Sequence, residues 1–584
     1  MYMKRVFISI FFLIPILGYA KSVDEDISRI VATNFIKSRI GIIPNLKLVH
    51  EGERVHTKAG QDTPSYYIYN KEDGGFVIIA GDDCVCPIIG YATNGSIPVE
   101  HMPDNFKAWL DMWTNVIDGL TLKGVTEPDA QKQWSDYYSG NNCASTKAEN
   151  AEMLLETAKW DQAYPYNLQC PKDGAELSLT GCTATATCII MRYHKWPISA
   201  TGTVPAYVTD TKKIQVPSMT LGAEYQWDKM PLVYTGNETP EQNDAVALLM
   251  SQVGAMIMSD YASEGTGSHS YFVTQVLNKY LKYDKSFVNL SAVNYEKKEW
   301  IEMIKNNIEN VGPLFYSGYG EGGHAFVVDG YDSADLIHIN WGWSGYGDGY
   351  FNYPYFNEYT NGQSAIFNIV KDAGGEYVDN LELFFDKSSG AKGLKVNVDV
   401  FETGTDFNAA INYVSNLSVS DFNGEIGIGK WNKYGSLDEV CGISKAEIQS
   451  YYANKIDIPG CKITTNIAIG DYLAPMYRST KTPQWTKIPY DLKMEEVNGI
   501  IYLTDPFSLE ERTSIMYNHV NGTCTITTKD DTSVVLRDEN GGNMVSHYKT
   551  EGNTISIDVK SLPKGYYTLI LDRGEEHKEI VMKF

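Results

Sequence analysis

A cysteine and a histidine that lie far apart in the sequence both have neighbours that suit covalent chemistry. Cys182 follows Gly181 and opens a run of small residues, Thr183 to Ala186, which is compatible with a helix that begins at the cysteine. At a helix N-terminus, unpaired backbone N–H groups and the helix dipole favour the thiolate. His324 follows two glycines and opens an apolar stretch of β character, Ala325 to Val328. Together the two residues predict a thiolate–imidazolium pair, the nucleophile and base of acyl-transfer chemistry.

Short motifs occur in a fixed order on both sides of this pair. They are Trp160-Asp161-Gln162, Tyr164 to Asn167, Cys170-Pro171, Gly181 to Ala186, Ile190 to His194, Trp196-Pro197, Tyr225 to Met230, Ser259 to Tyr261, Gly265 to Ser268, Gly312-Pro313, Tyr316 to Gly318, Gly323 to Phe326 and His338 to Trp343. In order and spacing, these motifs resemble the streptopain family of papain-like cysteine peptidases. The resemblance implies an α+β fold with two subdomains, in which a cleft separates a helical half bearing Cys182 from a sheet half bearing His324.

The resemblance also implies a role for each matching residue. Cys182 would be the nucleophile, and His324 the general base that takes the thiol proton and later protonates the leaving amine. Gln162 would supply the side-chain donor of the oxyanion hole beside the backbone N–H of Cys182, an effect typically worth about 3–4 kcal/mol per donor.

A second group of residues stands where papain-like enzymes orient or shield the imidazole. This group is Asn340, Trp341 and Trp343, and which of them contacts the imidazole stays open. Alternatively, the segment is only a strand and turn of the core. His269 lies in a Gly-Ser loop that is near the substrate cleft in the family, which makes it a candidate for substrate binding. Two further histidines are expected to be structural: His194 and His338.

The N-terminus has the pattern of a secretory signal peptide over residues 1–20. Lys4 and Arg5 precede an apolar run from Val6 to Leu17, and Gly18 and Ala20 are the small residues before the expected cut. The apolar run is short for a membrane span. We therefore expect a secreted or cell-surface protein without a membrane span.

Residues 21–122 predict a separate α/β unit. Helices are expected over 24–37 and 105–120, and strands over 66–70, 75–80 and 88–91. The segments Gly74 to Asp83, Pro87 to Tyr91 and Met102 to Phe106 resemble the streptopain prodomain. The resemblance implies an intramolecular inhibitor that blocks the cleft until it is cut off; the alternative is a binding module with no inhibitory role. The polar residues 123–149 predict a linker and maturation zone, with self-cleavage between Gly140 and Ala151.

The chain beyond the predicted peptidase domain, residues 150–372, has the texture of β-structure. Short strands between turn residues predict a β-sandwich over 373–515, with strands at 396–401, 424–428, 463–469 and 500–504. Residues 516–584 continue this pattern, and the segment Leu562-Pro563-Lys564-Gly565-Tyr566-Tyr567 resembles the C-terminal sorting domain of type IX secretion cargo. Binding of carbohydrate or protein, or a purely stabilising role, are the alternatives for this β-region.

The amino-acid composition and the absence of some motifs argue against several classes of binding partner and cofactor. The formal net charge of −24 disfavours nucleic acid and anionic membranes. The sequence lacks HExxH, paired CxxC and nucleotide-binding GxxxxGK[ST] patterns, so we expect no metal and no cofactor. Nine cysteines is an odd number, as expected if Cys182 stays free. Cys188 is expected to pack in the core. Cys441 and Cys461 could form a disulfide, as could Cys84 or Cys86 with another thiol.

These observations predict a secreted cysteine endopeptidase that is made as a zymogen and cleaves protein or peptide substrates through a Cys–His dyad and a thioester. Two alternatives stay open: a catalytically idle secreted binding or inhibitor protein, and another acyl-transfer enzyme on the same fold. The sequence leaves the cleavage preference, the maturation site and the mode of surface anchoring undetermined.

Overall fold

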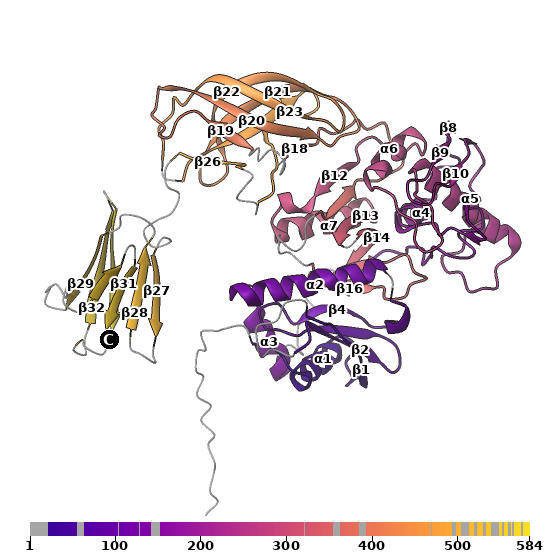
Figure 1. Cartoon of the computed structure of the whole chain (residues 1–584), viewed down its shortest axis with the longest axis horizontal. Coiled ribbons are helices and arrows are strands. Elements are labelled where there is room, and N and C mark those ends of the chain that lie inside the picture. Colours follow the sequence, from indigo (N-terminus) through magenta and orange to yellow (C-terminus); the bar gives the residue numbers. More distant parts are fainter. Residues whose placement is uncertain are drawn as a thin grey trace, which may run out of the picture.

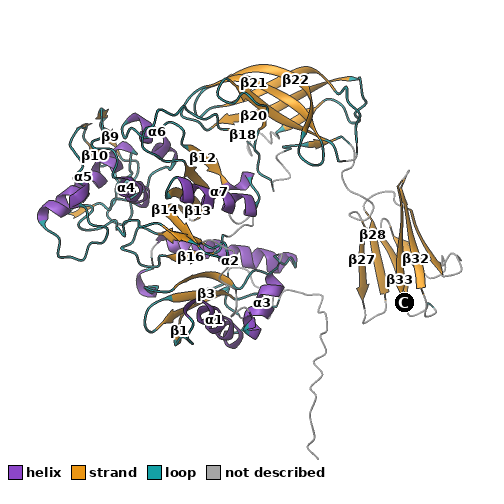
Figure 2. Cartoon of the chain, turned by 180° about the vertical axis from the view of Figure 1, so that it is seen from behind, coloured by secondary structure: helices purple, strands orange, loops and turns teal. Residues whose placement is uncertain are grey.

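The computed structural model describes residues 21–54, 63–102, 104–127, 129–141, 152–320, 322–353, 362–384, 393–468, 470–492 and 498–503, together with short segments between 513 and 583. The predicted signal peptide, residues 1–20, lies outside the described residues, as does most of the predicted cleavage region. Four units follow one another along the chain (Figure 1). The first two mix helices and strands, and the last two are built from strands (Figure 2).

The N-terminal unit is an α/β structure. Its elements are α1 (Glu25–Ile40), β1 (Leu46–Glu51), β2 (Tyr66–Lys71), β3 (Phe76–Ala80), β4 (Ile88–Ala92), the 3-10 turn Val99–His101, α2 (Asp104–Lys123) and α3 (Ala130–Ser139). Helix α1 begins where the Asp24 side chain accepts from the backbone N–H of Ile27, and ends at Gly41 with a φ of 79°. The two predicted helices and three predicted strands are confirmed.

The predicted linker over 123–149 needs correction. It contains helix α3, which packs on α1: the Tyr137 ring lies 5.4 Å from the Phe35 ring. The Asn34 side chain donates to the backbone oxygen of Tyr137 at 2.8 Å. The described part of this segment therefore continues the N-terminal unit and is not a structureless connection.

One sheet runs through the first two units. Its strand order is β1-β2-β3-β4-β16-β15-β14-β13-β17-β12, and β5 pairs with β14. The added strands are β5 (Met153–Leu154), β12 (Val288–Ser291), β13 (Leu314–Gly320), β14 (Gly322–Tyr331), β15 (Ile337–Asn340), β16 (Gly349–Phe351) and β17 (Ser364–Phe367). At the junction, Tyr350 pairs with Tyr91 and Phe351 with Gly90. A Cβ at Gly90 would lie 2.4 Å from the Phe351 ring, so this close pairing requires glycine.

Helices make up most of the other half of the second unit. They are α4 (Cys182–His194), α5 (Pro240–Met256), α6 (Tyr271–Lys279) and α7 (Lys297–Asn310), with 3-10 turns at Trp227–Lys229 and Ala292–Asn294. Two-residue strands form small hairpins: β6 (Lys172–Asp173), β7 (Glu176–Leu177), β8 (Thr203–Val204), β9 (Tyr207–Val208), β10 (Gln215–Val216) and β11 (Met219–Thr220). The first two units together have the predicted α+β fold.

The third unit is a sandwich of two antiparallel sheets around an apolar core. Its strands are β18 (Leu381–Leu383), β19 (Leu394–Val396), β20 (Asp406–Asn416), β21 (Phe422–Trp431), β22 (Leu437–Ile448), β23 (Ala453–Lys462), β24 (Tyr472–Ser479), β25 (Thr486–Lys487) and β26 (Ile501–Tyr502). The strand predicted over 463–469 is wrong, because β23 ends at Lys462 and residues 463–468 have no regular structure.

The fourth unit also has two sheets, ordered β27-β28-β31-β30 and β29-β32-β33. The strands are β27 (Thr513–Asn518), β28 (Thr523–Thr528), β29 (Ser533–Asp538), β30 (Tyr548–Glu551), β31 (Thr554–Asp558), β32 (Tyr566–Arg573) and β33 (Glu576–Lys583). Leu562 of the predicted sorting motif is buried, while residues 563–565 lie outside the described residues. Among the described helices, none is long and apolar enough to cross a membrane.

Candidate active site

Cys182 is the first residue of α4, as predicted. Gly181 precedes it with a φ of 84°, and a Cβ at this position would lie 2.6 Å from the backbone oxygen of Thr266. Glycine therefore allows both the turn and the close approach of the loop. Thr185 donates its backbone N–H to the Gly181 oxygen at 3.0 Å, which closes the first helical turn. The thiol consequently sits at the positive end of the helix dipole.

The surroundings of Cys182 shift the pKa of its thiol in both directions. Burial raises the pKa of the Cys182 thiol, although the backbone N–H groups of Ala325 and Thr183 lower it. Desolvation of the charged form outweighs these donors and the helix end. In this structure the thiol form of Cys182 is therefore favoured.

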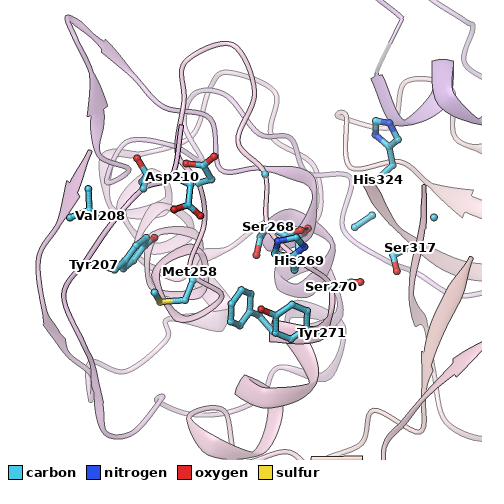
Figure 3. A pocket seen from close by; sticks show the side chains of 17 residues that line it. Tyr207, Val208, Asp210, Met258, Ser268, His269, Ser270, Tyr271, Ser317 and His324 are labelled. Carbon is cyan, nitrogen blue, oxygen red and sulfur yellow. Dashed lines mark hydrogen bonds between the residues drawn. The ribbon is translucent and has the colours of Figure 1, made fainter. Parts of the chain in front are cut away.

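His324 lies near the start of β14, as predicted. Side chains alternate between the two faces of a strand. Ala325 and Val327 belong to the apolar core that contains α4, whereas Phe326 and Val328 belong to the core shared with the N-terminal unit. His324 has the same parity as Phe326 and Val328. The strand thus directs His324 to the face that the N-terminal unit covers, and Figure 3 shows its ring turned away from His269 and Ser270.

Gln162 is buried beside the start of α4. Its backbone oxygen accepts from the N–H of Thr180 at 3.0 Å, two residues before Cys182. Its own backbone N–H donates to the Asp161 side chain at 2.6 Å. The other oxygen of Asp161 accepts from Ser344 Oγ at 2.7 Å. These contacts fix the backbone that carries the candidate oxyanion-hole amide.

Asn340 is held in the core by its own amide. Its side-chain nitrogen donates to Thr157 Oγ1 and to the Ala158 oxygen, each at 3.0 Å. Its side-chain oxygen accepts from the N–H of Gly342 at 3.1 Å. Among the described residues, the partners of this amide are backbone and hydroxyl groups, and two of them tie β15 to the segment at residues 157–158.

The two tryptophans of the same motif occupy the face that the N-terminal unit covers. Trp341 is buried, with its ring 5.3 Å from Phe106 and 5.9 Å from Trp109, and its indole N–H donates to the Gly347 oxygen. Trp343 packs against the same core and is partly buried. In this structure Trp341 contributes to the contact with the N-terminal unit.

That contact is extensive and largely aromatic. Helix α2 lies along β13 and β14 (Figure 1). Trp109 of α2 makes edge contacts with Phe326 and Phe351, at 5.9 Å and 6.2 Å between ring centres. Asn105 donates from its side chain to the backbone oxygen of Trp341 at 2.7 Å. The N-terminal unit therefore shares a continuous core with the sheet that carries His324.

The sequence analysis did not predict the polar contacts around this core. Arg39 of α1 forms an ion pair with Asp332 at 3.1 Å, and Tyr91 donates to the same carboxylate at 2.9 Å. Lys297 of α7 pairs with Glu127 at 3.1 Å. Each joins residues more than a hundred positions apart, which local sequence patterns do not connect.

A cavity of about 540 Å³ lies at Thr183, the second residue of α4 and the next in sequence after Cys182 (Figure 3). It is lined by Thr183, residues 207–210, Met258, Asp260, residues 267–272, Ser317, Gly318, His324 and Ala325. His324 and Ser317 stand at one side, and Tyr207 to Asp210 at the opposite side. The predicted binding candidate His269 lines it, stacked on Tyr271 at 5.5 Å. The cavity can accept a side chain next to the thiol.

The remaining predicted residues have structural surroundings. His338 bonds Asp329 at 2.5 Å, and this carboxylate helps to raise the pKa of His338. Burial lowers the pKa of His194, at the far end of α4, to about 4. The described cysteines are free, so the pairing considered for Cys441 and Cys461 is not formed. Cys188 is buried in the core, as predicted.

Profiles of three families match successive parts of the chain. The Spi protease inhibitor family matches residues 20–117, the Peptidase C10 family residues 160–351, and the secretion system C-terminal sorting domain residues 517–583. These matches agree with the predicted resemblance to streptopain, its prodomain and a sorting domain.

Individual proteins are similar to parts of the chain. Thiol protease/hemagglutinin PrtT of Porphyromonas gingivalis is 30% identical over 369 residues, which cover 62% of this chain and 42% of PrtT. Streptopain of Streptococcus pyogenes is 29% identical over 373 residues, which cover 60% of this chain and 89% of streptopain. A fragment of Prevotella intermedia prointerpain A has 28% identity and a TM-score of 0.45, and covers 56% of this chain and 100% of the fragment. The chain thus spans less than half of PrtT and most of streptopain.

Proposed function

We propose that the chain is a secreted cysteine endopeptidase made as a zymogen, because residues 160–351 match the Peptidase C10 family. The observation that carries the proposal is the position of Cys182, at the N-terminus of α4 and beside a cavity that reaches His324. The inhibitor-family match over residues 20–117 supports the zymogen, and the sorting-domain match supports secretion.

The proposed reaction is acyl transfer to water. The Cys182 thiolate attacks the scissile carbonyl, while the Gln162 amide and the Cys182 backbone N–H stabilise the oxyanion. Protonated His324 gives its proton to the leaving amine, which leaves a thioester on Cys182. His324 then takes a proton from water as the water attacks the thioester; the carboxylic acid product leaves, and the Cys182 thiolate and protonated His324 are restored. Substrates are polypeptides, with one side chain in the cavity beside Thr183.

The zymogen would be silent for two physical reasons. Burial raises the pKa of the Cys182 thiol, and alternation along β14 places His324 on the same face as Phe326 and Val328, which the N-terminal unit covers. Removal of the N-terminal unit would expose this face to water and let the imidazole turn toward the thiol. The resulting ion pair would then lower the pKa of Cys182.

Incubation of the full chain with a thiol reductant tests this proposal. We expect the chain to cut itself between Gly140 and Ala151 and to gain casein-cleaving activity, whereas Cys182→Ala stays full length. Gel electrophoresis and N-terminal sequencing record both results. Cys188→Ala, a buried cysteine of the same helix, is the matched control and should mature like the wild type.

Two results would contradict the proposal. Absence of peptide cleavage after another protease has removed the N-terminal unit would favour an idle binding protein. Turnover of amides or acyl donors without cleavage of protein would favour a different acyl-transfer enzyme.

A further inference from the structure

The β-sandwich contacts the wall of the cavity beside Cys182 at one of its turns. This turn, residues 449–452, joins β22 to β23. The Tyr451 ring lies 6.1 Å from the ring of Tyr271, the first residue of α6, and the Tyr451 hydroxyl lies 2.6 Å from Thr274 Oγ1. Tyr271 lines the cavity. Residues 177 positions apart in the sequence are thereby joined.

The sandwich holds Tyr451 in a fixed position. Its φ is 60°, a left-handed conformation that bulky residues rarely adopt. The backbone N–H of Tyr451 donates to the Asn416 oxygen, and the N–H of Asn416 donates to the Tyr452 oxygen, each at 2.9 Å. Asn416 is fully buried, and its amide donates to the Ile448 oxygen at 3.0 Å. The turn is therefore a rigid projection and not a loosely attached loop.

Hydrogen bonds link Tyr451 to the cavity wall through Thr274. The Thr274 hydroxyl donates to the backbone oxygen of Tyr271 at 2.7 Å. Because this uses the only hydroxyl proton of Thr274, Tyr451 is the donor in its bond to Thr274. The side chain of Ser270, the N-cap residue, makes no capping bond among the described residues. The contact with Tyr451 thus fixes a helix start that lacks its own side-chain cap.

The first turn of α6 carries an aromatic part of the cavity wall. The Tyr271 ring lies 4.3 Å from Phe272 and 5.5 Å from His269, and all three residues line the cavity. Other contacts anchor the sandwich on residues outside the lining. For example, Asn294 donates to Glu382 at 2.8 Å, and Tyr377 to Asn278 at 2.9 Å. Tyr451, in contrast, contacts Tyr271, which lines the cavity.

We propose that Tyr451 is a positioning residue of the substrate cavity: the β-sandwich fixes the first turn of α6, and with it the aromatic wall that receives an apolar side chain of the substrate. The sandwich then sets affinity for extended polypeptides and leaves the chemistry at Cys182 unchanged. This proposal rests on the proposed peptidase function, which supplies the substrate.

The test compares Tyr451→Phe with Tyr452→Phe in the full chain activated by reductant. Tyr452 is the neighbouring tyrosine and is 63% exposed, so its variant is the matched control. Two substrates are used: an N-blocked fluorogenic tripeptide with isoleucine two positions before the cut, and an N-blocked single-residue aryl ester that does not extend into the cavity. Loss of one hydrogen bond predicts a rise of about fivefold in the KM for the tripeptide in Tyr451→Phe. The ester kinetics and both kcat values stay unchanged, and Tyr452→Phe behaves like the wild type.

Equal kinetics for the two variants would overturn the proposal, and so would an equal loss of tripeptide and ester turnover in Tyr451→Phe. If the wild type cleaves neither substrate, the proposed function fails, and binding of the tripeptide decides the further inference. The lining residues all lie between Thr183 and Ala325, so binding can be measured by calorimetry on full-length Cys182→Ala. A dissociation constant about fivefold higher on adding Tyr451→Phe supports the proposal. An unchanged constant, or no binding at all, contradicts it.

Discussion

The two faces of strand β14 differ in what covers them. On one face, Ala325 and Val327 pack in a core formed by residues 158–369, which includes α4 and α5. On the other face, Phe326 and Val328 pack with Trp109 and other residues of the N-terminal unit. Both faces are buried to a similar degree, since these four residues are at most 4% exposed. Burial alone therefore does not distinguish the permanent core from the removable one.

The difference shows how one strand can serve both catalysis and latency. The face toward α4 brings the backbone N–H of Ala325 to the thiol, and the proposed maturation would leave this face covered. The opposite face directs His324 toward a cover that would leave after cleavage between residues 140 and 151. Because this cover is an aromatic core and not a loose lid, cutting the chain alone leaves strong noncovalent attraction. We expect full activity to require the N-terminal unit to dissociate or be digested.

The largest effect should come from the removable face. Trp109→Ala deletes a buried indole that contacts Phe326, Trp341 and Phe351. We expect the free energy of unfolding of the N-terminal unit to fall by about 3–5 kcal/mol, and maturation to become faster. Urea denaturation in the Cys182→Ala background and the rate of maturation measure these two effects.

The specific activity of the mature enzyme should be the same in Trp109→Ala as in the wild type, because residue 109 is lost on maturation. Trp485→Ala, a partly buried tryptophan of the β-sandwich, is the control and should leave maturation unchanged. If the two faces were coupled, Trp109→Ala would also lower the specific activity of the mature enzyme.

A substitution on the side of β14 toward α4 should lower activity and leave stability unchanged. Gln162→Ala removes the proposed side-chain donor of the oxyanion hole, and kcat/KM should fall roughly 10²–10³-fold. Its urea midpoint as a zymogen should stay close to that of the wild type. Gln169→Ala is the control, because Gln169 is exposed in the same loop. A fall in kcat/KM of less than about threefold would show that Gln162 does not stabilise the transition state.

Local patterns predicted the parts of the site that depend on local structure. The helix start at Cys182 follows from Gly181 and the small residues after it, and the strand at His324 from its apolar run. Helix α3 was missed because its sequence is mainly polar and only Ala130 and Trp134 are buried. Its stability comes from packing on α1, which no local pattern reveals.

The remaining parts of the site could not be predicted from local patterns, because they depend on contacts between residues far apart in the sequence. Alternation along β14 predicts two faces, yet which face meets the N-terminal unit depends on the pairing of β16 with β4. Asn340 was placed near the site by its motif, whereas its partners Thr157 and Ala158 lie more than 180 positions earlier. The contact of Tyr451 with Thr274 is of the same kind. Such contacts couple the units energetically. They can be identified only in the folded structure.

The smallest predicted effect concerns pH and a buried carboxyl near the removable face. Burial raises the pKa of Asp348 to about 7, while Asp348 accepts from the backbone N–H of Trp341. The folded chain then holds this proton more tightly than the unfolded chain, so the stabilisation is present below about pH 4 and is lost as pH rises toward 7. His338 acts in the same direction, since its pKa is also raised.

In Asp348→Asn, the plot of unfolding free energy against pH should lose a slope of up to about one proton over this interval. Asp399→Asn, at an exposed position, should keep the wild-type slope; an unchanged slope in Asp348→Asn would mean that Asp348 stays ionised beneath the N-terminal unit.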